Sequence, residues 1–164
     1  MKRIAYQHAA PDALRAIKGL ERYVRECGLE KGLIELIKIR VSQINGCAYC
    51  LDMHIKDALA TGETAQRIHL LSVWHEAPFY TRRERAALEW TAVVTDIGRD
   101  GVSDDLYRRT REHFAEKELV DLTMAVITIN GWNRLAICFG AEVGSYRPDL
   151  ATAPIASTYG FGQQ

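Results

Sequence analysis

The chain has 164 residues, of which 48% are hydrophobic and 26% charged, and this fits one soluble globular domain with its own core. Its 21 basic and 21 acidic residues balance, which argues against a nucleic-acid partner or an anionic membrane surface. No apolar run approaches the roughly 20 residues of a bilayer span, and the first residues lack a signal peptide's apolar stretch. We therefore expect a cytosolic protein with no membrane partner.

Helical spacing of apolar residues runs through most of the chain, and no convincing pair of strands is present. Gly28, Gly62 and the Gly98–Gly101 stretch are natural helix ends, while Thr81 and Ser103 are natural helix starts. The predicted helices are 11–27, 31–44, 47–61, 63–71, 82–97, 104–114 and 117–139. The sequence therefore predicts an all-α fold, with one domain over residues 1–144 and an extended or partly disordered tail over residues 145–164.

The segment from Lys31 to Ile44 is apolar on nearly every side, so we expect it to be a central helix. Glu35 is the exception, a carboxylate inside the most apolar part of the chain. Burial raises the pKa of a carboxyl group, so Glu35 could carry a proton. In the alternative, Glu35 only pairs with Lys38, Arg40 or a cation on a neighbouring helix.

A C-x-x-C-x-x-x-H pattern follows this helix, formed by Cys47, Cys50 and His54. In a helix these residues lie close to one stripe, so the sulfurs can meet and the imidazole lies one turn from Cys50. Asn45 and Gly46 suggest that the helix starts here, which would put the cysteines where the helix dipole favours a thiolate. In a reducing compartment such a pair is more often redox-active or metal-binding than structural.

These groups match what peroxide reduction needs: a thiolate, a proton for the departing oxygen and a second thiol to trap the sulfenic acid. Cys50 and Cys47 supply the thiols, and His54 exchanges protons near neutrality. A structural metal site built from Cys47, Cys50, His54 and Glu35 stays open as a second hypothesis. A non-redox enzyme, or a scaffold with incidental thiols, is the third.

Glu35, Cys47, Cys50 and His54 together resemble the E-x11-C-x-x-C-x-x-x-H signature of the AhpD-like alkylhydroperoxidases, within the carboxymuconolactone decarboxylase superfamily. The similarity extends through residues 35–50 and includes the blocks 82–90 and 129–136. In all it covers about residues 12–141. The superfamily's lactone decarboxylases lack the cysteine pair, so its presence favours the redox branch.

The resemblance implies an AhpD-like helical fold, with the C-x-x-C pair at the start of a central helix, in homo-oligomers built on trimers, commonly hexamers. It also implies reduction of hydroperoxides, in which Cys50 attacks the peroxide and Cys47 closes the disulfide. Glu35 and His54 would relay protons, no cofactor or metal would be needed, and a dithiol partner such as a lipoyl-bearing protein would restore the thiols. The best-studied type has a second histidine between its cysteines, where this chain has Tyr49, a hydrogen-bonding group but no base near neutral pH.

Overall fold

The computed structural model describes residues 3–148, and these residues form helices and connecting turns with no strand. The all-α fold is therefore confirmed for this part of the chain. The helices are α1 (Tyr6–Ala9), α2 (Pro11–Glu26), α3 (Lys31–Asn45), α4 (Ala48–Ala60), α5 (Ala65–Leu70), η1 (Leu71–Val73), α6 (Arg82–Thr95), α7 (Ile97–Asp100), α8 (Asp104–Arg111) and α9 (Glu116–Phe139).

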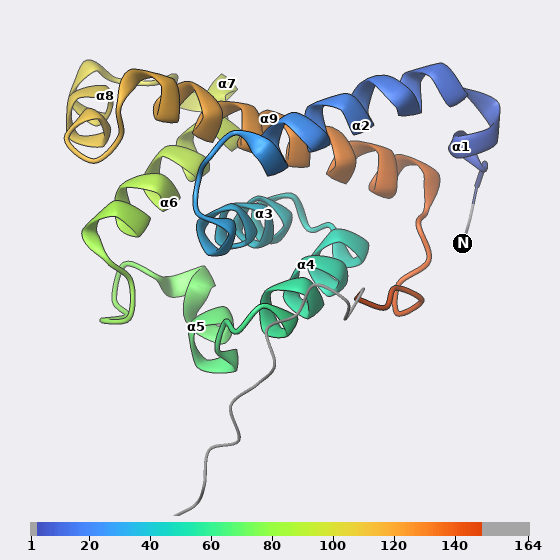
Figure 1. Cartoon of the computed structure of the whole chain (residues 1–164), viewed down its shortest axis with the longest axis horizontal. Helices are drawn as coiled ribbons and strands as arrows, with labels where there is room; N and C mark the ends of the chain where they lie inside the picture. Colours follow the sequence, from blue (N-terminus) through green and yellow to red (C-terminus); the bar gives the residue numbers. More distant parts are fainter. Residues whose placement is uncertain (1–2, 149–164) are drawn as a thin grey trace, which may run out of the picture.

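Helix α3 lies at the centre and packs against α4, α6 and α9, and its Lys38 side chain reaches Glu21 of α2 (Figure 1). Eight of its residues are buried, and they face all directions, as the apolar composition predicts. One apolar cluster joins α3 to α2, α6 and α9, and a second joins it to α4, α5 and α6. Because neighbouring helices pack around α3, its backbone holds the side chains that point toward α4 in defined positions.

The predicted helix boundaries agree closely with the observed ones where the sequence has a clear capping residue. Thr81 and Glu84 form the expected capping box at the start of α6, and the Ser103 side chain accepts from the Leu106 N–H at the start of α8. Short helices were less well predicted. The sequence did not indicate α1, and α6 ends at Thr95 with the separate turn α7 following it.

Helix α9 meets the length and composition criterion for a membrane span, which corrects the expectation that no segment approaches that length. A long core helix of a globular protein meets the same criterion, and α9 packs along α2, α3 and α6 (Figure 1). The criterion alone is thus weak evidence for a membrane.

The chain after α9 returns to α4 rather than leaving the molecule (Figure 1). Tyr146 donates a hydrogen bond to Asp57 at 2.7 Å, and the Lys56 ammonium donates to the Tyr146 carbonyl at 3.2 Å. The first residues of the expected tail, 145–148, are thus irregular in conformation but anchored. The rest of that tail, residues 149–164, lies outside the described residues.

Candidate functional site

The two cysteines of the motif occupy the first turn of α4. Gly46 ends α3 in the left-handed conformation, with φ 67°, and this reverses the chain so that Cys47 becomes the residue capping α4. Cys50 follows within the first turn, and both side chains are only 1% exposed. The predicted position of the C-x-x-C pair at a helix start is therefore what the structure shows.

The two thiols differ in their affinity for a proton. A hydrogen bond from the Cys50 thiol, together with backbone N–H groups of Cys50 and Tyr49, lowers the pKa of Cys47 to about 7. The same hydrogen bond, with burial and the nearby Cys47 charge, raises the pKa of Cys50. Cys47 therefore ionises before Cys50, over the range around neutral pH, while Cys50 keeps its proton.

His54 lies one helical turn beyond Cys50 on the same buried stripe of α4. Its Nδ1 atom is 2.9 Å from Oε2 of Glu35, which reaches across from α3. The structure thus joins Glu35 and His54, the two residues expected to relay protons, which lie 19 positions apart in the sequence. A carboxylate on one ring nitrogen fixes the imidazole, so that the other nitrogen is free to exchange protons.

Glu35 is ionised at neutral pH, contrary to the expectation that burial raises its proton affinity. Burial does act in that direction, but the hydrogen bond from His54 and the charges of His54 and Lys38 outweigh it and lower the pKa of Glu35. The Lys38 ammonium lies 3.6 Å from Glu35 and 2.6 Å from Glu21 on α2. The structural pairing with Lys38 and the contact with His54 are therefore both present.

A buried polar network supports the start of α4 from the side of α9. The Asn133 amide donates to the Ser42 hydroxyl at 3.1 Å and also lowers the proton affinity of Cys50. Asn45 donates to Asn130 and Asn133, each at 2.9 Å. The sequence analysis named none of these as site residues. The amides on the apolar helix α9 could have indicated them, because buried amides need hydrogen-bond partners.

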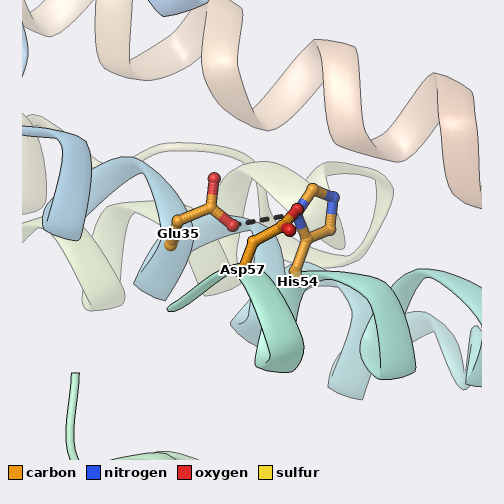
Figure 2. A group of neighbouring side chains, drawn as sticks. All are labelled: Glu35, His54 and Asp57. Carbon is orange, nitrogen blue, oxygen red and sulfur yellow. Dashed lines mark hydrogen bonds and ion pairs between the residues drawn. The ribbon is translucent and has the colours of Figure 1, made fainter. Parts of the chain in front are cut away.

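Asp57 is a further site residue that the sequence analysis missed. It lies three residues after His54 on α4, and its carboxylate lies beside the Glu35–His54 pair (Figure 2). Ligand-capable atoms of Glu35, His54 and Asp57 all lie within 4.8 Å of one another. The i, i+3 spacing from His54 was the signal that could have identified it.

The hypothesis of a metal site built on the cysteines does not match this arrangement. Within residues 3–148, the donors that converge are Glu35, His54 and Asp57, and the two thiols are outside the group. Glu35 already faces the Lys38 ammonium, and Asp57 already accepts from the Tyr146 hydroxyl. Both negative charges therefore have partners within the chain.

A small polar pocket of about 200 Å³ opens at Tyr49, and neither cysteine lines it. Tyr49, the residue between the cysteines, forms part of its wall together with Tyr6 of α1. Burial, with the neighbouring thiols, raises the pKa of both phenols, so both keep their protons and can donate hydrogen bonds. The remaining lining residues come from the N-terminal segment and the end of α9: Ile4, Gln7, Phe139, Gly140, Ala141, Glu142 and Ser145.

Residues 11–93 match the model of the carboxymuconolactone decarboxylase family, a stretch that contains α2 to α5, most of α6 and the whole Glu35, Cys47, Cys50 and His54 set. The chain belongs to the carboxymuconolactone decarboxylase family. Its AhpD-like character, implied by the four-residue signature, also agrees with its structural relatives.

Two relatives match nearly the full described chain. The uncharacterised protein YdfG of Bacillus subtilis is 44% identical over 144 residues, which are 88% of this chain and 98% of YdfG. A solved structure from Agrobacterium tumefaciens, of unknown function and named as a candidate AhpD antioxidant defence protein, is 45% identical with a TM-score of 0.86, covering 89% of this chain and 100% of that one.

A more distant structural relative carries a different name. The debrominase Bmp8 was solved as a cysteine-to-alanine variant in complex with 2,3,4-tribromopyrrole. Its structure matches with a TM-score of 0.74 at 17% identity, and the match covers 85% of this chain and 74% of the Bmp8 chain. At this identity the likeness shows the shared fold alone. Helical proteins of this fold therefore include enzymes with different reactions, and the site must decide the particular reaction.

Proposed function

We propose that the protein reduces hydroperoxides through a Cys47–Cys50 dithiol–disulfide couple. The observation that carries this proposal is the pair of free thiols at the start of α4, one with a lowered pKa, with a buried imidazole one turn away. The AhpD-like relatives support the same chemistry.

The reaction divides into two steps. In the first, His54 accepts the proton of Cys50, and the Cys50 sulfur attacks the outer oxygen of the hydroperoxide. The O–O bond breaks, Cys50 becomes a sulfenic acid, and the departing alkoxide takes a proton from the imidazolium. In the second, the Cys47 thiolate attacks the Cys50 sulfur, the S–S bond forms and the sulfenic oxygen leaves as hydroxide, which takes up a proton to become water.

Glu35 is assigned the role of holding His54 in the geometry that lets it exchange this proton. An ionised carboxylate 2.9 Å from Nδ1 also stabilises the imidazolium that forms when Cys50 is deprotonated. A dithiol partner, such as a lipoyl-bearing protein, then reduces the disulfide and completes the cycle. The same residues would also serve disulfide exchange with such a partner.

The test is mass spectrometry of the tryptic peptide that runs from Val41 to Lys56 and contains both cysteines. The protein is fully reduced and then exposed briefly to less than one equivalent of a hydroperoxide. Loss of two hydrogens from this peptide, much faster than oxidation of free cysteine, supports the couple. The matched control is the Cys27→Ser, Cys138→Ser double variant, which retains only the motif thiols and should react as fast.

Two outcomes would redirect the assignment. A reduced pair that does not react with hydroperoxide would contradict the redox proposal. Catalytic activity of the purified protein that survived loss of both Cys47 and Cys50 would favour a non-redox reaction like that of the family's decarboxylases.

A further inference from the structure

The proposed reaction needs a proton that the thiol pair does not hold above neutral pH. A hydroperoxide reduced by one thiol and one thiolate yields an alcohol, a disulfide and a hydroxide, so one proton must arrive from solvent for water to form. Because the pKa of Cys47 is about 7, the pair is in this state above neutrality. The groups that handle the proton are enclosed, since the side chain of His54 is 5% exposed and that of Glu35 is 17% exposed.

Asp57 is placed to connect this enclosed pair with the surface. It is half-buried, whereas His54 is buried, and its carboxylate lies beside the imidazole in Figure 2. Its ligand-capable oxygen is within 4.8 Å of both Glu35 and His54. One water molecule or a small side-chain rotation spans that distance, so a proton on Asp57 can reach the pair in one transfer.

Tyr146 fixes Asp57 in this place. Its hydroxyl donates to Oδ1 of Asp57 at 2.7 Å, and the Lys56 ammonium holds the Tyr146 backbone carbonyl at 3.2 Å. Burial and the neighbouring Asp57 raise the pKa of Tyr146, so the phenol stays protonated and remains a donor. The segment that follows α9 therefore contributes a contact to the relay on α3 and α4.

We propose that Asp57 carries protons between solvent and the Glu35–His54 pair, and that Tyr146 positions its carboxylate. This inference rests on the proposed function, because it supplies the proton that disulfide closure consumes. It extends the relay beyond the four residues of the sequence signature and brings in a residue from the far end of the chain.

The experiment measures disulfide closure in the full chain by stopped-flow mixing of reduced protein with hydroperoxide. Asp57→Asn removes the carboxylate that can take up and release a proton, and Tyr146→Phe removes the hydrogen bond that holds Asp57. Glu89→Gln is the matched control, since Glu89 is a half-buried carboxylate on α6, and its ion pair with Arg109 at 2.7 Å lies outside the relay. All variants are compared at about pH 8 and about pH 6, with increasing acetate or imidazole buffer as an external proton source.

Among the described residues, few titratable or charged groups lie near the proposed proton path through Asp57. Their protonation states determine how the closure rate depends on pH. Those near Asp57 are Glu35 and Lys38 on α3, His54 on α4 and Tyr146, and those near Cys47 are Cys50, Tyr49 and Tyr6.

At about pH 8 we expect closure in Asp57→Asn to slow by roughly 10- to 100-fold, and in Tyr146→Phe by roughly 3- to 10-fold. Buffer should restore the rate in Asp57→Asn, and the defect should shrink at about pH 6, where Cys47 brings its own proton. Glu89→Gln should match the unaltered protein. A merely structural role would slow closure equally at both pH values and would not respond to buffer.

Two failures are distinguishable. If the unaltered protein reacts and Asp57→Asn matches it at both pH values, the role of Asp57 is overturned while the proposed function stands. If the unaltered protein does not react with hydroperoxide at all, the proposed function fails, and the role of Asp57 fails with it.

Discussion

At the scale of single residues, the unequal proton affinities of the two thiols are the feature with the clearest consequences. Cys47 accepts hydrogen bonds from the helix start and from Cys50, whereas Cys50 is buried beside a negative charge. Cys47 therefore ionises before Cys50, and in the proposed reaction Cys50 needs a base before it can attack. The position of His54 one turn away answers that need.

The pKa of Cys47 can be tested by following thiolate absorbance at about 240 nm against pH. We expect one thiolate to form with a midpoint of about 7 and the rate of Cys47 alkylation to rise through the same range and then level off. In Cys50→Ala the donor thiol is gone, so the midpoint should move up toward the ordinary value of 9.0. An unchanged midpoint would mean that Cys50 does not stabilise the thiolate.

Glu35 gives a second prediction at this scale, on stability. Because its pKa is lowered on folding, its contribution to the free energy of unfolding is present above the ordinary value of 4.5 and is lost as the pH falls through the folded value. Glu35→Gln should therefore lower the free energy of unfolding near neutral pH by roughly 1–3 kcal/mol, with a smaller difference below about pH 4.

Urea unfolding at both pH values measures this difference. Glu116→Gln is the control, because the Glu116 side chain is 87% exposed and we expect no measurable change. A constant difference between Glu35→Gln and the unaltered protein at both pH values would show that the ionised carboxylate is not what stabilises the fold.

At the scale of elements, the junction between α3 and α4 determines where the thiols lie. Gly46 adopts the left-handed conformation there, and the turn it makes brings the Cys47 N–H to the Ser42 carbonyl at 3.0 Å. The start of α4 is thereby fixed on the core helix, so the thiols and the relay share one rigid support.

Gly46→Ala should destabilise the protein by about 1 kcal/mol, because a side chain disfavours the left-handed conformation, and it should reduce thiol reactivity by moving the start of α4. Gly19→Ala is the matched control, since Gly19 lies inside α2 without a positive φ and with free space around it. There alanine should stabilise by about 0.5–1 kcal/mol. Equal effects at the two sites, measured by thermal unfolding, would contradict this account of the junction.

At the scale of the whole molecule, several large apolar side chains along α9 are open to solvent. Val120 is 58% exposed, and Ile127 and Ile137 are each 47% exposed. A single copy of the chain leaves this surface uncovered, which supports the proposal of a homo-oligomer, a trimer or hexamer as the resemblance implies.

Sedimentation of the purified protein should therefore give a mass several times the 18.5 kDa of one chain. Ile127→Glu, which places a charge on this surface, should reduce the mass, whereas Val143→Glu, at an exposed site after α9, should not. A protein that sediments as a single chain at high concentration would rule out this proposal.

The sequence by itself determined the helical class, most helix boundaries, the central position of α3 and the set Glu35, Cys47, Cys50 and His54. These follow from local rules: apolar spacing sets the helices, caps set their ends, and the motif spacing places the thiols and imidazole on one stripe. Residues 31–44 are apolar on nearly every side of their helix, so this helix had to be buried on every side.

Only the tertiary structure decided which contacts these residues make. The ionisation of Glu35 depends on cations from other positions, and burial alone had suggested the opposite direction. Tyr146 reaches Asp57 across 89 positions, and Asn133 reaches Ser42 across 91. Such contacts have no local pattern, because a hydrogen bond between distant residues depends on where whole helices pack. The short helix α1 was likewise missed, since four residues carry too little periodicity to be recognised.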